Sequence, residues 1–285
     1  MIKKQSFSRI SRAKVNLSLH VVGKRSDGYH CLDSLVAFPR VGDEISMEPS
    51  RNIDLKVVGR LADELKSREN LVLSAINLLN HDGKGASIIL NKDLPISAGL
   101  GGGSSNAALV LRMLTKLWQQ PLPSMNSLIS LGSDVPACLD WHLKRMQGRG
   151  EILEKVVEPP KPPTIWIVLA NNREKVSTGI IFNAVQTFNN EGLGILPIFK
   201  TAEIFLNYLH GQRNDLEAPA LKLFPQIMTL LNTIRNTSGC KISRMSGSGA
   251  TCFGLFLKES DAQKASLDLA KSFPKAWIRV AQLFS

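Results

Sequence analysis

The stretch DLPISAGLGGGSSNAA, residues 93–108, places four glycines within five positions directly before a run of helix-forming residues. Glycine adopts backbone angles that other residues avoid, and it lets a ligand approach the main chain closely. We expect Ser104 or Ser105 to cap the following helix, whose free N–H groups and dipole attract an anion. The segment could also be a tight turn that needs glycine for its geometry alone. Four glycines with two serines at a helix start favour a phosphate-binding loop.

The two common phosphate-binding loops do not fit this stretch. A P-loop requires a lysine after the glycines, and none is present. A dinucleotide-binding fingerprint requires a third glycine where this chain has Ser104. The sequence therefore favours a phosphate-binding loop of another kind.

Length and composition indicate a globular protein. The chain has 285 residues, of which 44% are hydrophobic and 21% charged, enough for one large or two medium domains. No run approaches the roughly 18 apolar residues of a membrane span. The first residues, MIKKQSFSRISRAK, lack the apolar core of a signal peptide. We therefore expect a cytoplasmic protein that does not bind a membrane.

The net charge is +11, which is compatible with nucleic acid, an anionic surface or an anionic small substrate. The basic residues are scattered and form no stripe interleaved with aromatic residues, which argues against nucleic acid. Four cysteines lie far apart without a histidine cluster nearby, so free thiols are expected rather than a disulfide or zinc site. They are Cys31, Cys138, Cys240 and Cys252.

Hydrophobic patterning in the first half predicts mixed strands and helices. Residues 13–21, AKVNLSLHV, alternate as in a strand with one buried face, which puts Lys14 and Asn16 together on the other face. Further strands are predicted at 44–47, 53–58 and 86–90, and helices at 70–80 and 104–118.

The second half predicts another α+β unit. The proline-rich stretch 156–164, VVEPPKPPT, indicates a linker or edge connection. A strand is predicted after it, followed by a helix capped by Ser177, a mostly helical stretch, and then the order strand, strand, helix, strand. The ranges are 165–170, 177–188, 214–236, 240–245, 251–257, 261–273 and 276–282. Two α+β domains are expected, residues 1–157 and 158–285.

From Pro95 onward, PISAGLGGGSSNAA resembles the phosphate loop of the GHMP kinases, named for galactokinase, homoserine kinase, mevalonate kinase and phosphomevalonate kinase. Three other segments resemble motifs of the branch that phosphorylates a cytidyl substrate. Weaker matches, GRGEIL and NDLEAPALKLFP, extend the similarity over nearly the whole chain. The three segments are AKVNLSLHVVGKRSDGYHCLDSL, LGSDVPACL and SRMSGSGATCFGLF.

The resemblance implies a two-domain GHMP kinase fold of the α+β class. Its N-terminal domain would contain a left-handed βαβ unit, its C-terminal domain would be ferredoxin-like, and the active site would lie between them. It also implies ATP as donor with Mg²⁺, the 2-hydroxyl of the cytidyl substrate as acceptor, and a monomer or weak dimer. No metal ligand is assigned, although Ser105 could assist the ion or the phosphates. The ATP loop would comprise Pro95, Ile96, Ser97, Ala98, Gly99, Leu100, Gly101, Gly102, Gly103, Ser104 and Ser105.

Two residues are expected to be catalytic by the same resemblance. Asp134 would accept the proton of the attacking hydroxyl; taken alone, it could equally cap a helix or start a turn. Lys14 would keep that aspartate ionised and stabilise the acceptor oxygen, although a lysine on a strand is usually solvated. Asn16 could hydrogen-bond the same groups.

The resemblance also implies an acceptor site around DGYH, where Tyr29 would stack on cytosine and His30 would hydrogen-bond its edge. Phe182 is a candidate for a second stacking ring, with a core position equally weighted. Lys92 would lie near the nucleotide or substrate, or be a surface charge.

The stretch from Ser246 to Gly249 contains Gly247 and Ser248 and would bring a second loop to the reacting groups. It could also be a simple hairpin turn. Two other functions stay open: a kinase acting on homoserine or mevalonate, which DGYH argues against, and an inactive nucleotide-binding regulator, which Lys14 and Asp134 argue against.

Overall fold

The computed structural model describes residues 7–65, 70–157, 159 and 162–284. The chain divides by contacts into two interleaved compact units. The first comprises Met1–Ala13, Val41–Ile96 and Gly101–Trp141, and the second Lys14–Arg40, Ser97–Leu100 and His142–Ser285. The predicted boundary near residue 157 cuts the chain at a single point. The division by contacts instead groups residues 14–40 and 142–157 with the C-terminal half. Residues 158, 160 and 161 of the expected linker lie outside the described residues.

The first unit is built on one sheet with the strand order β1-β4-β6-β5. Its strands pair antiparallel except β5 and β6, which run parallel with helix α1 between them in sequence. This arrangement gives the βαβ unit that the family resemblance implies. The bounds are β1 Phe7–Arg12, β4 Gly42–Ser50, β5 Ile53–Val58, α1 Leu71–Ile76 and β6 Gly85–Asn91.

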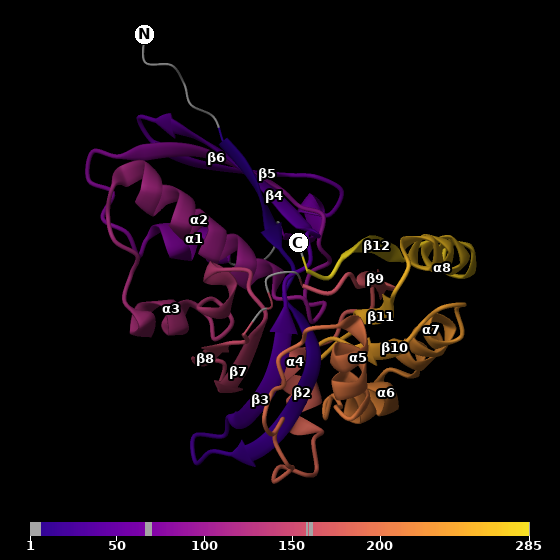
Figure 1. Cartoon of the computed structure of the whole chain (residues 1–285). Helices are drawn as coiled ribbons and strands as arrows, with labels where there is room; N and C mark the ends of the chain where they lie inside the picture. The colour runs from indigo at the N-terminus through magenta and orange to yellow at the C-terminus, as the bar shows by residue number, and fades with distance from the viewer. Residues whose placement is uncertain (1–6, 66–69, 158, 160–161, 285) are drawn as a thin grey trace. The chain divides into compact units, whose positions relative to one another are not determined.

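Helix α2, Gly102–Trp118, packs against α1, β1 and β4 of this unit (Figure 1). Its apolar residues recur at helical spacing, and Ala107, Val110, Leu111 and Leu114 are fully buried. Burial of each such leucine or valine stabilises the fold by about 1.5–3 kcal/mol. The unit also contains the short helices η1 Ala62–Leu65, α3 Met125–Leu131 and η2 Ala137–Leu139.

The second unit contains two four-stranded antiparallel sheets, the first with the order β2-β3-β7-β8. Strand β2, Val15–Lys24, confirms the strand predicted from alternation. The expected exposed face was wrong, since Lys14 is only 5% and Asn16 0% exposed. Residues 213–215 run along the edge of β2, with a bridge between Leu19 and Asn214, and the Asn16 side chain donates to the Ser34 hydroxyl of β3. The other strands are β3 His30–Ala37, β7 Lys144–Gly148 and β8 Ile152–Lys155.

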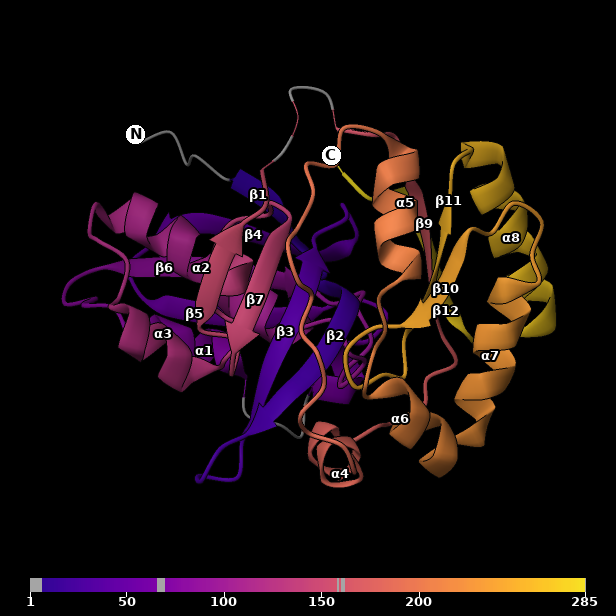
Figure 2. The ribbon, with the colours of Figure 1, turned by 60° about the horizontal axis from the view of Figure 1, so that its bottom comes forward.

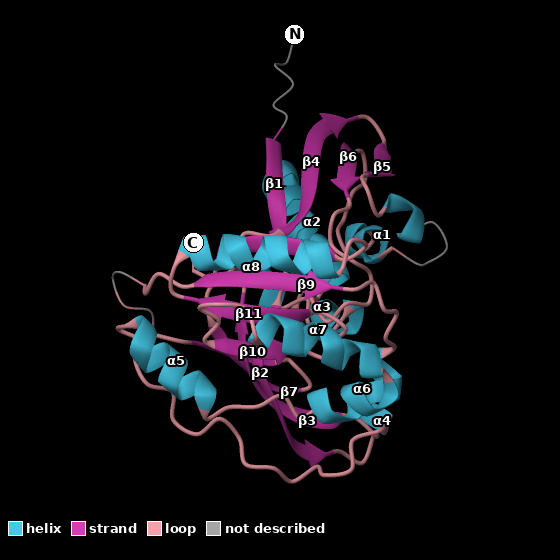
Figure 3. Ribbon diagram, turned by 90° about the vertical axis from the view of Figure 1, so that its right-hand side faces the viewer, coloured by secondary structure: helices cyan, strands magenta, loops and turns pink. Residues whose placement is uncertain are grey.

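The second sheet has the order β10-β11-β9-β12 with antiparallel neighbours. The chain order strand, helices, strand, strand, helix, strand makes this the expected ferredoxin-like arrangement. Helices α7 and α8 cover one face and α5 lies on the other (Figure 2, Figure 3). The bounds are β9 Trp166–Asn171, α5 Ala202–His210, α7 Pro225–Arg235, β10 Ile242–Met245, β11 Cys252–Phe256, α8 Glu259–Ser272 and β12 Trp277–Gln282.

Two predicted helices of this unit are shorter than expected. The helix after Ser177 is α4, Thr178–Asn183, and Ser177 is its N-cap without a side-chain hydrogen bond. The helical stretch 214–236 is divided into α6, Glu217–Leu223, and α7, because Pro225 cannot donate the amide that would continue α6. The four predicted elements of the C-terminal tail are confirmed.

All four cysteines are free thiols, and Cys138 and Cys252 are buried. Among the described residues, no helix is both long and apolar enough to cross a membrane.

Candidate active site

The glycine-rich loop leads into α2 through left-handed backbone. Ser97, Gly99 and Gly101 have φ values of 52°, 73° and 59°. The N-cap of α2 is Gly101, which has no side chain to cap the helix. The prediction that Ser104 or Ser105 is the cap was therefore wrong, since the helix begins at Gly102 and both serines lie in its first turn. A helix start without a side-chain cap presents backbone N–H groups that favour an anion.

The two serines have different surroundings within the first unit. The Ser105 hydroxyl is buried and donates to the carbonyl of Arg12 at 2.6 Å, so it ties the start of α2 to β1. Ser104 is partly exposed, and a Cβ built on Gly132 would lie 3.6 Å from its hydroxyl oxygen. Ser104 is therefore the better placed hydroxyl for a bound phosphate.

Asp134 lies in a turn between α3 and η2 and is partly exposed. Its carbonyl accepts the amide of Cys138 at 3.2 Å, and the amide of Val135 donates to Gly132 at 3.0 Å. Helix η2 packs against α2. The first unit therefore brings the segment of the predicted base to the helix that starts with the glycine loop.

Lys92 lies in the interior of the first unit. Its ammonium donates to the Asp43 carboxylate and to the Leu94 carbonyl, both at 2.7 Å. Asp43 also accepts the Asn106 side-chain amide at 2.8 Å and the backbone amides of Asp93 and Leu94 at 2.7 Å. This buried ion pair joins β4, the end of β6 and α2. It favours a structural role for Lys92 over the predicted substrate contact, and Asp43 is a residue that the sequence analysis missed.

The stretch from Ser246 to Gly249 forms the hairpin turn between β10 and β11, as one of its two interpretations predicted. The Ser246 hydroxyl donates to the Gly99 carbonyl at 2.8 Å and accepts the Asn16 amide at 3.1 Å. A Cβ on Gly99 would collide with the carbonyl oxygen of Ser246. Residues 97–100 and this hairpin loop, which were identified separately in the sequence, therefore lie in direct contact.

Lys14 and Asn16 adjoin the same loops. The Lys14 amide donates to the Leu100 carbonyl at 2.8 Å. The Asn16 side chain donates to the Ser34 hydroxyl at 2.7 Å, while its buried Oδ1 has no hydrogen-bond partner among the described residues. A Cβ on Gly247 would lie 3.2 Å from that oxygen. A ligand donor could satisfy it.

The DGYH motif forms the turn between β2 and β3. The Asp27 carboxylate accepts the Tyr29 amide at 3.2 Å, and Gly28 has a φ of 86°. Tyr29 is 56% exposed, and the Arg149 guanidinium lies 4.3 Å from the centroid of its ring. Tyr29 therefore offers an exposed ring that is partly covered by a cation.

His30 is buried between two phenyl rings, with centroids 5.2 Å from both Phe182 and Phe188. Burial, and secondarily Lys24, lowers the pKa of His30, so the ring is neutral at pH 7. Its Nε2 has no hydrogen-bond partner within the described part of the chain. Phe182 is half-buried and also packs against the core of the second unit. Both interpretations of Phe182, core residue and neighbour of the acceptor site, are compatible with these contacts.

Models of the GHMP kinases N terminal domain and the GHMP kinases C terminal domain match residues 70–140 and 199–275 of the chain. The chain therefore belongs to the GHMP kinase family. It is 45% identical to 4-diphosphocytidyl-2-C-methyl-D-erythritol kinase of Cereibacter sphaeroides, over 96% of this chain and 98% of that one. The kinase of the same name from Paramagnetospirillum magneticum is 42% identical over 98% of this chain and 99% of that one.

Solved structures agree with this grouping. A crystal structure of 4-(cytidine 5'-diphospho)-2C-methyl-D-erythritol kinase matches with a TM-score of 0.79 and 31% identity, over 97% of this chain and 99% of that one. Homoserine kinase from Cytophaga hutchinsonii matches with a TM-score of 0.70 at 16% identity, over 100% and 97% of the two chains, which shows the shared fold. Within its family the chain thus groups with the 4-diphosphocytidyl-2-C-methyl-D-erythritol kinases, and as a kinase it takes ATP as a substrate.

Proposed function

We propose that the chain transfers the γ-phosphoryl group of ATP to the 2-hydroxyl of 4-diphosphocytidyl-2-C-methyl-D-erythritol, giving the 2-phosphate and ADP. The observation that carries this proposal is 45% identity, over 96% of the chain, to a kinase named for that substrate. The oxygen of the hydroxyl attacks the γ-phosphorus, the bond from that phosphorus to the bridging oxygen of ADP breaks, and no phospho-enzyme forms.

The glycine loop would hold the phosphates of ATP. The main chain from Pro95 to Ser105 contains three residues with left-handed backbone, and α2 starts at Gly102 with uncapped amides. These amides and the positive end of the helix dipole would bind the phosphate oxygens. Ser104 would add its hydroxyl, whereas Ser105 would position the helix.

Asp134 and Lys14 would carry out the proton transfer and the charge stabilisation. Asp134 would accept the proton of the 2-hydroxyl, a contribution of typically about 10²- to 10⁴-fold for a positioned base. Lys14 is buried and would stabilise the developing negative charge on the acceptor oxygen. Direct transfer needs little more than this positioning and charge neutralisation.

Mg²⁺ would neutralise charge on the phosphates of ATP when bound. Among the described residues, no group of three or more His, Cys, Asp or Glu side chains could hold a metal ion. This fits an ion held mostly by substrate phosphates and water, with one or two protein oxygens. The Ser104 hydroxyl is the protein oxygen that we propose for it.

The acceptor would bind along the second unit. Tyr29 would stack on the cytosine. The Nε2 of His30 would hydrogen-bond the edge of the base, and the ring of Phe182, which stacks on His30, would hold the imidazole in place. Asn16, Gly247 and Ser248 would contact the part of the acceptor nearer the reacting hydroxyl.

The proposal is tested by ADP release from ATP when the cytidyl substrate is offered beside mevalonate, homoserine and galactose at equal concentration. We expect the cytidyl substrate to give a kcat/KM at least about a hundredfold above the others, because a site built for polar base edges rejects acceptors without them. Preferred turnover of an acceptor without a nucleobase would overturn the proposal.

A further inference from the structure

The segment NDLE, which begins at Asn214, contains a buried carboxamide that the proposed reaction does not use. The Asn214 side chain is 7% exposed. Its Nδ2 donates to the carbonyls of Met245 and Gly247, both at 2.8 Å, and its Oδ1 accepts the Leu216 amide at 3.0 Å. One side chain therefore holds the end of β10 and the following hairpin loop at the same time.

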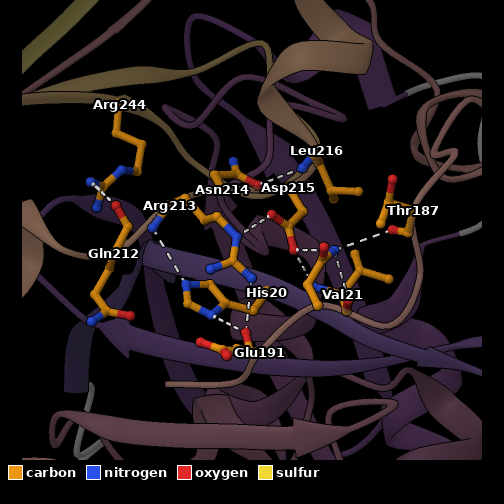
Figure 4. Close-up of polar contacts among 11 residues, drawn as sticks. His20, Val21, Thr187, Glu191, Gln212, Arg213, Asn214, Asp215, Leu216 and Arg244 are labelled. Carbon is orange, nitrogen blue, oxygen red and sulfur yellow. Dashed lines mark hydrogen bonds and ion pairs between the residues drawn. The ribbon is translucent and has the colours of Figure 1, made fainter. Parts of the chain in front are cut away.

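Asn214 is itself fixed by strand β2. The Leu19 amide donates to the Arg213 carbonyl at 2.9 Å, and the Asp215 amide donates to the Leu19 carbonyl at 2.8 Å. The Asp215 carboxylate accepts the Val21 amide at 2.7 Å. Figure 4 shows Arg213, Asp215 and Val21 beside His20, whose Nε2 accepts the Arg213 amide at 3.4 Å. Because both neighbours of Asn214 are bonded to β2, its side chain has a fixed origin from which to reach the loop.

The loop position that Asn214 holds adjoins other candidate site groups. Ser246 contacts the glycine loop through the Gly99 carbonyl, and the Ser248 hydroxyl lies 2.9 Å from that of Thr178. Gly247 has a φ of 56°, close to the unsatisfied Oδ1 of Asn16. A shift of the Gly247 carbonyl would therefore move the backbone that faces Asn16.

The chemistry of the site requires an amide. Two carbonyl oxygens face the same nitrogen, and one acceptor faces a backbone N–H. A carboxamide supplies two donors and an acceptor in one plane. An aspartate of the same shape would place an oxygen against both carbonyls, and an alanine would leave two buried carbonyls without this donor.

We propose that Asn214 is a positioning residue of the kinase: it fixes the hairpin loop so that Gly247 and Ser248 meet the acceptor in a productive geometry. This inference rests on the proposed function for the assignment of the loop to the reaction. Asn214 acts through the loop and contacts no substrate itself.

The test compares two alanine variants, each of which removes a side-chain amide that donates hydrogen bonds to main-chain carbonyls. Asn190 also uses its side-chain amide on this part of the fold, donating to the Val21 and Thr187 carbonyls and to Asp215, at 3.0–3.2 Å. None of these contacts involves the hairpin loop. We expect Asn214→Ala and Asn190→Ala both to lower Tm, whereas only Asn214→Ala lowers kcat, by about tenfold to a hundredfold, the scale of a misplacement of about 1 Å.

The KM for ATP should change by less than about twofold in both variants, because a misplaced loop slows the transfer step and does not weaken the binding of ATP. Asn214→Asp should behave like Asn214→Ala, and Asn214→Ser, whose hydroxyl can donate one bond, should retain an intermediate kcat. If Asn214→Ala does not fold, the comparison is made with Asn214→Ser. A normal kcat in a folded Asn214 variant with a lowered Tm would reduce Asn214 to a structural role and overturn the inference.

Hydrogen exchange separates this inference from the proposed function. We expect the amides of Ser246 and Gly249 to exchange faster in Asn214→Ala than in Asn190→Ala, without any substrate present. Inactivity of the wild-type protein on the cytidyl substrate would overturn the proposed function. Equal exchange rates in both variants would instead overturn the inference that Asn214 holds the hairpin loop.

Discussion

His30 and Phe182 stack with ring centroids 5.2 Å apart and 26° between their planes. The contact links the turn motif at the start of β3 to helix α4 within the second unit. It places a phenyl ring on one face of the histidine whose Nε2 has no hydrogen-bond partner among the described residues. The orientation of this imidazole therefore depends on Phe182.

The first prediction concerns Phe182. Phe182→Ala should raise the KM for the cytidyl acceptor by up to about tenfold, because the imidazole of His30 loses its orientation and with it a hydrogen bond to the base of about 0.5–1.5 kcal/mol, and it should leave the KM for ATP unchanged. Phe273→Ala is the matched control, because Phe273 packs against the same core without contacting His30. Steady-state kinetics and Tm are measured for both. An equal loss of Tm with an unchanged acceptor KM would make Phe182 a core residue only.

The second prediction concerns the left-handed glycine that starts α2. Gly101→Val imposes a left-handed β-branched residue and places a side chain at the proposed phosphate site, so ATP binding should be lost in calorimetry. Gly83→Val is the control, since Gly83 has a φ of 66° and nothing within 4 Å of a built Cβ. Both variants carry the backbone cost, whereas only Gly101→Val should lose ATP. Unchanged ATP affinity in Gly101→Val would exclude the loop from phosphate binding.

The third prediction concerns the buried pair of Asp43 and Lys92. Asp43→Asn leaves an uncompensated ammonium inside the first unit and should lower the free energy of unfolding by about 3–5 kcal/mol. Lys92→Met should destabilise the protein too, and the double variant should lose less than the sum of the two. Denaturant unfolding measures all three. A folded Lys92→Met protein with normal stability and a raised KM for the acceptor would support the predicted substrate contact of Lys92 instead.

The fourth prediction concerns His20. Burial, and secondarily Arg213, lowers the pKa of its imidazole in the folded protein. The unfolded chain therefore binds the proton more readily, so the stability contribution of His20 is complete above about pH 6.5 and is lost as the pH falls through the folded value. Protonation would also remove the acceptor of the Arg213 amide.

The measurement compares the unfolding free energies of wild type and His20→Gln at pH 7.5 and 5.0. The wild type should lose more stability between the two pH values than the variant does. The variant is needed as a reference because burial raises the pKa of Glu217, which acts in the opposite direction over acidic pH. Equal losses in the two proteins would show that His20 does not titrate in this way.

Local sequence patterns correctly predicted the elements whose secondary structure depends mainly on their own residues. The alternation in 13–21 predicted β2, and the glycine loop with its helix predicted the start of α2 within two residues. Strand β3, HCLDSLVA, is buried on both faces and shows no clear alternation, so periodicity did not predict it. Strand β7 is short and pairs with the distant β3, which no local pattern contains, and the four-residue strand β8 in turn pairs with β7.

Long-range contacts explain the site residues that the sequence misplaced or missed. Asp43 and Lys92 are 49 positions apart, and a single lysine before a loop does not reveal whether its partner is a substrate or an interior carboxylate. Asn214 is 31 positions from Met245. The N-cap of α2 is Gly101, whose backbone is left-handed. The preference for serine at N-caps, on which the prediction rested, does not reveal such a start.

Single-turnover transfer of γ-labelled phosphate tests whether ATP phosphorylates the cytidyl substrate directly, with Asp134 as the base. We predict that wild-type protein places the label on the 2-hydroxyl of 4-diphosphocytidyl-2-C-methyl-D-erythritol and none on the polypeptide. Asp134→Asn, with unchanged ATP binding, should do so at least about a hundredfold more slowly. Label on the protein would exclude direct transfer, and transfer by Asp134→Asn at the wild-type rate would exclude Asp134 as the base.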